Sequence, residues 1–219
     1  MRAAAILVLL SVVCVPPLVA QQTAVSVDRA ADDLDRHYND LRSLRAAFTE
    51  TYSGAGITRT ESGTLWLSRP GKMRWEYLEP REKLFISDGK TAYFYVPGER
   101  QARKAPLDKL DDLRSPLRYL LGKTKLKKEF DKLTARSGDQ PGTVVIRGIP
   151  KNMADRVAEV TMELNPAGQI QRIQIDEVDG SQTEFAFSSI QENVPVEDAR
   201  FRFQPPPGVE LIESSAVTP

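Results

Sequence analysis

The sequence predicts an α+β protein built around an antiparallel sheet. Strand-like segments follow one another in two consecutive runs, at residues 44–96 and 143–190, and no helix separates successive strands within a run. Counting segments between turn signals gives about ten strands and three or four helices. Because no linker, internal repeat or low-complexity block interrupts the chain, one domain over residues 21–219 accounts for it.

The first twenty residues have the pattern of a secretory signal peptide. Arg2 precedes an apolar run from Ala3 to Val15, which a proline pair follows, and small residues end at Ala20. The apolar run is about 13 residues long, whereas a membrane-spanning helix needs roughly 20. We therefore expect cleavage near Ala20 and export of residues 21–219, with an uncleaved membrane anchor as the alternative.

The composition argues against disulfide bonds in the exported chain and against a nucleic-acid partner. Cys14 is the only cysteine, and its flanks do not fit the small residue that precedes a lipidated cysteine, so it is interpreted as part of the signal segment. The exported chain then has no disulfide and must be held together by its core. The sequence holds 30 basic and 30 acidic side chains, and this balance gives no reason to expect a nucleic-acid partner.

The exported chain is predicted to begin with an amphipathic helix. Val27, Ala31, Leu34, Tyr38 and Leu41 recur at spacings of four and three residues, with charged residues between them. Acidic side chains crowd the first turns, where they suit the positive end of the helix dipole. After this helix, alternation over residues 44–49 predicts a strand, with a continued helix as the alternative.

A meander of four strands is predicted next. Turn residues mark its limits: Arg69-Pro70-Gly71, then Pro80, Asp88-Gly89 and Pro97-Gly98. Alternation within the second strand places its apolar side chains on one face and its charged ones on the other. The predicted strands are Thr60–Ser68, Lys72–Glu79, Lys83–Ser87 and Thr91–Val96.

Leucines at helical spacing predict two short helices over residues 107–122. Ser115 and Pro116 separate the two helices, since serine caps a helix and proline suits a first turn, and Gly122 ends the second. Four more strands follow, with hairpin turns at residues 165–168 and 179–180. We predict these strands at residues 143–148, 156–164, 169–178 and 181–190.

The usual signatures of catalysis are missing from the sequence. His37 is the single histidine and is expected to face solvent or to cap the first helix, so a zinc site of the usual kind is excluded. No glycine-rich phosphate-binding motif occurs. A glycosidase pair would have to come from Glu76, Glu79, Asp88 and Asp179, but the two aspartates precede glycines in turns, where backbone geometry explains them. We therefore expect no enzyme, no metal site and no cofactor.

One basic segment leaves two interpretations open. Residues 123–132 carry five lysines. The cluster could dock an acidic partner or lipid head groups, or it could be a solvated face diluted by Glu129 and Asp131.

Several motifs resemble the periplasmic outer-membrane lipoprotein carrier proteins, the LolA family. They are Gly63-x-Leu-Trp-Leu-x-Arg-Pro-Gly-x-Met-Arg-Trp-Glu-Tyr77, Ile86-Ser-Asp-Gly-Lys-Thr91, Tyr95-x-Pro97 and the late segment Ala199-Arg-Phe-Arg-Phe-Gln-Pro-Pro-Pro-Gly-Val209. Their order and spacing agree with the family from about residue 30 to residue 209, and the three blocks around Arg69, Asp88 and Pro205 together are specific.

The resemblance implies a fold and a function. It implies an incomplete β-barrel with helices that form a lid over an apolar cavity. It also implies a periplasmic, monomeric carrier that takes the acyl chains of lipoproteins from an inner-membrane ABC exporter to an outer-membrane receptor. Arg69 stands where the family has an arginine that latches the lid to the barrel. Met73 stands where an aromatic residue is frequent, and its flexible side chain keeps the wall apolar.

These expectations define a candidate site. The candidate site consists of apolar strand residues, or their neighbours on the opposite face of the same strands, together with leucines of the predicted lid. The strand sequence does not decide whether Trp66 or Trp75 faces the cavity. A second hypothesis keeps the fold but makes it an envelope lipid or lipoprotein sensor. The predicted cavity residues are Leu65, Leu67, Met73, Trp75, Tyr77, Ile86, Phe94, Leu110, Leu113, Leu117 and Leu120.

Overall fold

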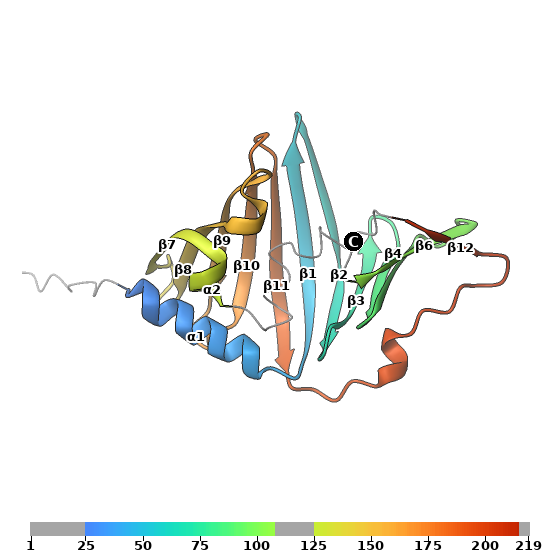
Figure 1. Ribbon diagram of the computed structural model, residues 1–219, viewed down its shortest axis with the longest axis horizontal. Helices are drawn as coiled ribbons and strands as arrows, with labels where there is room; N and C mark the ends of the chain where they lie inside the picture. Colours follow the sequence, from blue (N-terminus) through green and yellow to red (C-terminus); the bar gives the residue numbers. More distant parts are fainter. Residues whose placement is uncertain (1–24, 108–124, 215–219) are drawn as a thin grey trace, which may run out of the picture.

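A computed structural model describes residues 25–107 and 125–214 of the chain. These residues form one twelve-stranded sheet in the order β12-β6-β5-β4-β3-β2-β1-β11-β10-β9-β8-β7 (Figure 1). The strands are β1 Ser43–Gly54, β2 Ile57–Ser68, β3 Lys72–Glu79, β4 Lys83–Asp88, β5 Thr91–Tyr95, β6 Gln101–Pro106, β7 Phe130–Ser137, β8 Val144–Pro150, β9 Val157–Leu164, β10 Ile170–Glu177, β11 Gln182–Glu192 and β12 Glu210–Glu213.

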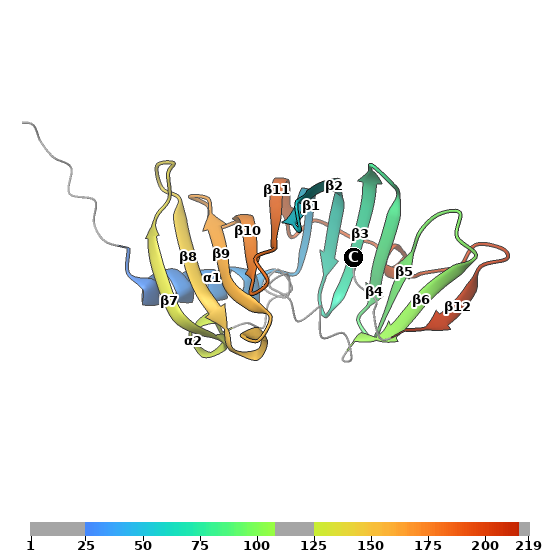
Figure 2. The same ribbon diagram turned by 90° about the horizontal axis from the view of Figure 1, so that it is seen from above.

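The sheet is open, because its edge strands β12 and β7 end the hydrogen-bonded order at opposite ends (Figure 2). The prediction of a sheet without strand-helix-strand units is confirmed. The count of about ten strands missed β6, β7 and β12, which carry many charged residues and little apolar alternation. β12 also departs from the antiparallel prediction, because it pairs with β6 in parallel register from Glu210↔Gln101 onward.

The pairing of β1 with β11 joins the two runs of strands into one sheet. Phe48 lies opposite Phe187, and Tyr52 lies opposite Thr183, so an early strand pairs antiparallel with a late one. β1 also pairs with β2 along its full length, from Ser43↔Ser68 to Gly54↔Ile57. The strand alternative after the first helix is therefore the one that the structure adopts.

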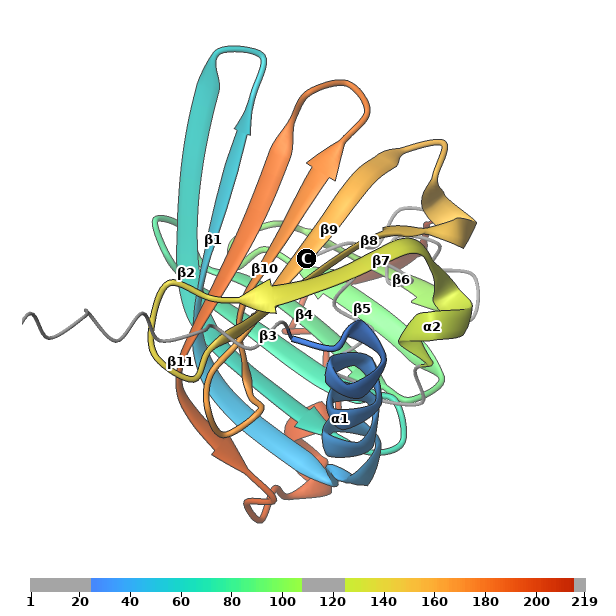
Figure 3. The same cartoon turned by 90° about the vertical axis from the view of Figure 1, so that its left-hand side faces the viewer.

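Helix α1, Val27–Asp40, agrees with the predicted amphipathic helix. The hydroxyl of Ser26 accepts a hydrogen bond from the backbone N–H of Arg29 at 3.4 Å and caps the helix. The buried face of α1 consists of Ala30, Ala31, Leu34 and Tyr38. The short helix α2, Leu126–Glu129, contacts α1, and both lie on the same side of the sheet (Figure 3).

Two short 3₁₀ helices, η4 Lys151–Met153 and η5 Asp198–Phe201, complete the described elements. The predicted helices at residues 107–122 fall almost wholly outside the described residues. No helix in the described ranges is long and apolar enough to cross a membrane.

The two faces of the sheet differ in what covers them. The inner face, defined here as the face that packs with α1, carries one continuous core cluster that includes Phe48, Leu65, Trp75, Ile173 and Phe185. The outer face is covered along β3 and β4 by η5 and its flanking residues. The strand alternation therefore buries apolar side chains on both sides of this part of the sheet.

Candidate functional site

An aromatic cluster lies at the centre of the inner face. The ring centroid of Trp75 lies 4.8 Å from that of Phe48, 5.8 Å from that of Phe185 and 6.4 Å from that of Phe187. The rings of Phe48 and Phe185 approach Trp75 edge-on, which is the geometry that aromatic quadrupoles favour. Three strands from distant parts of the sequence, β1, β3 and β11, thus build a single apolar wall.

Six of the predicted cavity residues share this inner face. In the strand register Leu65 lies opposite Trp75, Leu67 lies opposite Met73, and Phe94 lies opposite Phe85, which is itself opposite Trp75. Because paired residues project to the same side of a sheet, the register brings these side chains together. The six are Leu65, Leu67, Met73, Trp75, Tyr77 and Phe94.

Ile86 is the predicted cavity residue that the register places elsewhere. It lies opposite Arg74 on β3 and Tyr93 on β5, so it projects from the outer face. There it lines a groove of about 470 Å³ together with Phe203 of the C-terminal segment. The apolar run Leu84-Phe85-Ile86 hides the alternation, and the structure gives Phe85 the inward place that the sequence analysis gave to Ile86.

The four leucines of the predicted lid, Leu110, Leu113, Leu117 and Leu120, lie outside the described residues. The candidate site is therefore described from the sheet and from α1 alone.

The question of the two tryptophans is decided by the register. Trp75 projects inward, whereas Trp66 lies opposite Arg45 and Arg74 on the outer face. The guanidinium carbons of Arg45 and Arg200 lie 4.8 Å and 4.1 Å from the centroid of the Trp66 ring. Trp66 thus contacts two cations on the side of the sheet away from α1.

Gly63 makes room for the aromatic cluster. It sits at an irregularity in the pairing of β2 with β3, opposite Tyr77. A Cβ atom at this position would come within 1.8 Å of the carbonyl oxygen of Glu76 and 3.0 Å of the Phe48 ring. Glycine is therefore required here for close packing of the two strands against Phe48.

Arg69 connects the sheet to helix α1. It follows β2 directly, and its guanidinium Nη2 donates a hydrogen bond to the backbone carbonyl oxygen of Tyr38 in the last turn of α1. Carbonyls at this end of a helix have no intrahelical partner and carry partial negative charge, so a cation is well placed. Burial lowers the pKa of Arg69, while the Asp40 carboxylate opposes that shift.

Two turns that meet beside Arg69 fix its position. The hydroxyl of Ser87 donates to the carbonyl oxygen of Gly71 at 3.0 Å and accepts from the backbone N–H of Gly89 at 3.1 Å. Gly89 has a φ of +95°, and a Cβ atom there would lie 2.8 Å from the carbonyl oxygen of Pro70. The Ser-Asp-Gly-Lys-Thr motif thus supports the turn that carries Arg69.

Tyr38 anchors α1 from its other side. Its buried hydroxyl oxygen accepts a hydrogen bond of 2.8 Å from the backbone N–H of Ile170 at the start of β10. Burial raises the pKa of this phenol, so it remains protonated. The end of α1 is therefore bound to β2 through the Tyr38 carbonyl and to β10 through the Tyr38 side chain.

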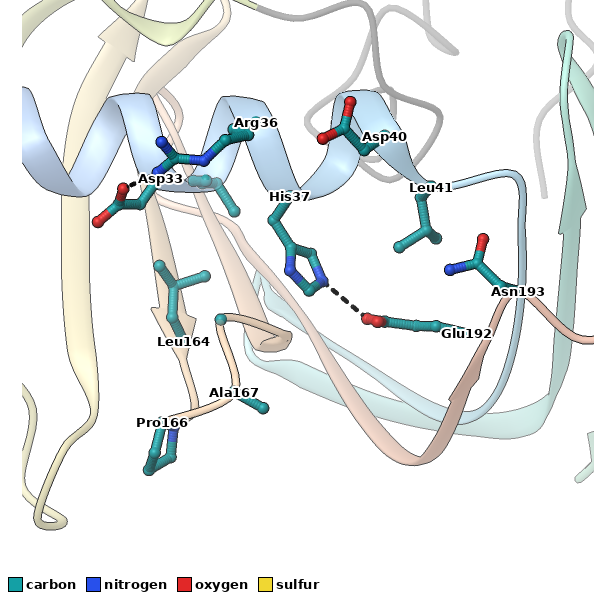
Figure 4. Close-up of a pocket in the computed structure, with 12 residues that line it drawn as sticks. Asp33, Arg36, His37, Asp40, Leu41, Leu164, Pro166, Ala167, Glu192 and Asn193 are labelled. Carbon is teal, nitrogen blue, oxygen red and sulfur yellow. Dashed lines mark hydrogen bonds and ion pairs between the residues drawn. The ribbon is translucent and has the colours of Figure 1, made fainter.

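His37 was predicted to face solvent or to cap the first helix, and in the structure its imidazole contacts a carboxylate of a distant strand. Its Nε2 lies 2.9 Å from Oε1 of Glu192 at the end of β11, and both side chains are partly buried. The pair lines a groove of about 530 Å³ between α1 and the turn that precedes β10 (Figure 4). Helical periodicity placed His37 on the charged side of the helix and could not reveal a partner so distant in sequence.

A polar cluster lies on the inner face at the end of β2 remote from Arg69. The Tyr77 hydroxyl donates to Oε2 of Glu50 at 2.6 Å, and Nζ of Lys83 lies 2.7 Å from Oε2 of Glu61. The same Nζ lies 4.2 Å from the Tyr77 ring centroid, and Nε of Arg59 lies 3.6 Å from Glu61. Burial raises the pKa of Glu50, while the hydrogen bond from Tyr77 opposes that shift.

Three of the four carboxylates considered for catalysis, Glu76, Asp88 and Asp179, have structural roles. Asp88 Oδ1 accepts from the backbone N–H groups of Lys90 and Thr91, each at 2.8 Å, and Asp179 Oδ1 accepts from Ser181 in the same way. Glu76 pairs with Arg74 at 2.5 Å. The turn interpretation of the two aspartates is therefore confirmed. Within residues 25–107 and 125–214, no group of histidine and acidic side chains could hold a metal ion.

The basic segment at residues 123–132 is described from Lys125 onward. Lys127 binds two aspartates of α1, with its Nζ 2.8 Å from Asp32 and 3.7 Å from Asp28. Asp35 accepts the backbone N–H of Leu126 at 3.1 Å. These contacts attach α2 to α1, so part of the segment serves an internal interface.

Several members of the inner wall carry no signal in the local sequence pattern. Phe185 and Phe187 fall in the strand predicted at residues 181–190, but nothing in the local pattern linked them to Trp75. Phe48 was assigned only to a strand. The link exists because β1 pairs with both β2 and β11, and pairing partners of such separation leave no local signal in one sequence.

The fold and this face define a class of protein: one open, mostly antiparallel sheet whose apolar inner face packs against a helix. The family model described as outer membrane lipoprotein carrier protein LolA matches residues 39–204. The chain therefore belongs to the LolA family of outer membrane lipoprotein carrier proteins.

Comparisons with individual proteins agree with this assignment. The outer-membrane lipoprotein carrier protein of Edwardsiella ictaluri is 30% identical over 183 residues, which cover 83% of this chain and 86% of that protein. The carrier protein of Alkalilimnicola ehrlichii is 29% identical over 202 residues, covering 91% and 89% of the two chains. An uncharacterized conserved protein from Thermus thermophilus shares the fold, with a TM-score of 0.56, 11% identity, and coverage of 87% of this chain and 100% of that one.

Proposed function

We propose that this protein carries lipoproteins through the periplasm by binding their acyl chains on the inner face of the sheet. The observation that carries the proposal is the wall of Phe48, Trp75, Phe185 and Phe187, within a family whose named members are lipoprotein carriers. The wall is apolar, and it holds no group placed for covalent chemistry.

Energetics favour a carrier of this kind. Each methylene group removed from water contributes about 0.8 kcal/mol, so bare acyl chains are costly in an aqueous compartment. A wall of large aromatic and aliphatic side chains offsets that cost without a cofactor. Release of the acyl chains requires that the wall become exposed to water or that the space beside it become narrower. The hydrogen bond between the Arg69 guanidinium and α1 can break without disrupting the sheet.

The carrier is proposed to act as a monomer between two membranes. An inner-membrane ABC exporter would load it, and an outer-membrane receptor would take the cargo. Helices of the segment between β6 and β7, with α1, would form a lid over the apolar cavity, and Arg69 would latch that lid to the sheet. Export by a signal peptide over residues 1–20 brings the protein to the periplasm.

A loading assay tests the proposal. The mature protein is incubated with inner-membrane vesicles that contain labelled lipoprotein, the exporter and ATP, and the supernatant is assayed for a soluble complex. A soluble complex is expected, and none should form without ATP. Failure to form one with an active exporter would contradict the carrier function and leave a sensor role for the same fold.

Matched variants locate the binding face. Phe94 is half-buried on the inner face, so Phe94→Asp is expected to reduce loading strongly because it places a charge among the acyl chains. Ile57 is 60% exposed at the tip of the β1–β2 hairpin, and Ile57→Asp is expected to load like the wild type. Equal loading by the two variants would contradict the assignment of the inner face.

A further inference from the structure

The polar cluster on the inner face has no role in the proposed binding of acyl chains. Its members are Glu50 on β1, Arg59 and Glu61 on β2, Tyr77 on β3 and Lys83 on β4. Charged groups on a face that packs against a core are costly unless they are paired, and Glu61 is 7% exposed. Binding of acyl chains by the apolar wall therefore does not explain why these charged side chains lie on the inner face.

The cluster begins where the aromatic wall ends. The Phe48 ring contacts Trp75 on one side, with centroids 4.8 Å apart, and Tyr77 on the other, with centroids 4.9 Å apart. Glu50 follows Phe48 on the same face of β1 and holds the Tyr77 hydroxyl. An amphiphile whose tail lies along the wall would thus place its polar end beside Glu50 and Lys83, which are both half-buried.

Charge balance indicates which polar end fits. The carboxylates of Glu50 and Glu61 are offset by Lys83 and Arg59, and both cations already contact Glu61. A phosphate in this place would meet two carboxylates and no unpaired cation. A neutral head group with carbonyl acceptors and amide donors would meet neither a net repulsion nor an unpaired charge.

A buried donor on the aromatic wall supports a carbonyl ligand. The indole Nε1–H of Trp75 has no hydrogen-bond acceptor among the residues that the structure describes, although the side chain is 1% exposed. A buried donor without an acceptor is uncommon in native proteins and costs free energy. The carbonyl oxygen of an acyl ester, which joins the tail to the head group, is an acceptor of the required kind.

We propose that Glu50, Glu61, Tyr77 and Lys83 form a head-group subsite that selects neutral acylglyceryl esters over anionic phospholipids with the same tails. The proposal rests on the proposed function, since it assumes that acyl chains occupy the inner face. The shared chemistry of the ligand is the glyceryl ester carbonyl, which free diacylglycerol and the diacylglyceryl-cysteine of a lipoprotein both carry.

Lipids with identical tails test the selection. Binding of dioctanoylglycerol, dioctanoyl phosphatidylglycerol and a diacylglyceryl-cysteine peptide to the full mature chain is measured by titration calorimetry. The wild type is expected to bind the two neutral ligands more tightly than the anionic lipid. Preference for the peptide over dioctanoylglycerol would identify the lipoprotein as the source of the head group.

Charge variants make the proposal falsifiable. Glu61→Gln leaves Lys83 unpaired and is expected to raise affinity for the anionic lipid by about tenfold, which corresponds to about 1.4 kcal/mol, because it adds one net positive charge to the cluster. The double variant Glu61→Gln/Lys83→Gln restores the balance and is expected to restore the selection. Glu159→Gln, which changes net charge equally on the outer face, is the control.

The outcomes separate this proposal from the carrier function. If the folded wild type binds none of the three ligands, the proposed binding of acyl chains is wrong. If it binds neutral and anionic lipids equally, or if Glu61→Gln and Glu159→Gln have the same effect, the head-group subsite is wrong while the carrier function stands. Circular dichroism of every variant establishes that it is folded before binding is compared.

Discussion

The guanidinium of Arg69 donates a hydrogen bond to the backbone carbonyl oxygen of Tyr38, which joins the end of β2 to the last turn of α1. The bond uses a carbonyl that the helix itself leaves unpaired. Ser87 and Gly89 of the next hairpin stabilise the turn that carries Arg69. The motif Ile86–Thr91 therefore positions the side chain of Arg69, which belongs to the motif Gly63–Tyr77.

Replacing Arg69 by Leu is expected to leave loading intact and to impair delivery to the outer-membrane receptor. The variant loses a charge-assisted hydrogen bond, so the position of α1 is no longer coupled to the turn after β2. Transfer of labelled lipoprotein from the loaded variant to receptor-containing vesicles measures the effect. Arg36→Leu, which removes an exposed arginine of α1 that pairs with Asp33, is the control, and normal delivery by Arg69→Leu would contradict the latch role.

Replacing Tyr38 by Phe is expected to lower the free energy of unfolding by about 1–3 kcal/mol. The substitution keeps the ring but leaves the buried backbone N–H of Ile170 without its acceptor. Urea denaturation followed by circular dichroism measures the change. A loss below about 0.5 kcal/mol, the range of ordinary surface substitutions, would show that the hydroxyl does not anchor the helix.

The two tryptophans are expected to respond differently to lipid. Acyl chains with bromine atoms quench nearby indole fluorescence, and Trp75 lies on the inner face whereas Trp66 contacts Arg45 and Arg200 on the outer face. Brominated lipid should therefore quench the Trp66→Phe variant, which retains Trp75. It should leave the fluorescence of Trp75→Phe nearly unchanged. The reverse pattern would place the ligand on the outer face.

Glu50 is expected to make the protein less stable as pH rises. Burial raises its folded-state pKa above the unfolded value, so the folded protein binds more protons between the two values. The resulting stabilisation is complete below the unfolded pKa and is lost as pH rises through the folded one. Glu50→Gln should remove this component, so its unfolding free energy relative to the wild type should increase from acid pH toward neutral pH. Urea titrations across this range measure it, and parallel profiles would contradict the role of burial.

The outer face offers a test of the C-terminal segment. The Phe203 ring stacks on Tyr93 with centroids 5.3 Å apart and also contacts Tyr95 at 5.9 Å. Phe203→Ala is expected to cost about 1–3 kcal/mol of stability, because a half-buried aromatic contact is lost. The loss should appear in urea unfolding without a change in lipid affinity. A large change in affinity would contradict the separation of the two faces.

The sequence by itself determined most of the local structure, with the exception of β6, β7 and β12. The 3.6-residue period predicted α1, turn dipeptides limited β3, β4 and β5, and the glycine and aspartate turns took the forms that backbone geometry requires. The family motifs predicted the kind of protein. They also pointed to Arg69, whose contact with α1 depends on a turn that the same motifs encode.

Only the tertiary structure decided which side chains meet. The order of twelve strands places β1 beside β11, and this long-range pairing joins Phe48 and Trp75 to Phe185 and Phe187. Register decided that Phe85 and not Ile86 faces inward, since a shift of one residue exchanges the two faces of a strand. The partners of His37 and Tyr77, and with them the polar cluster, arise from the same pairings, because contacts between distant strands leave no period in the sequence between them.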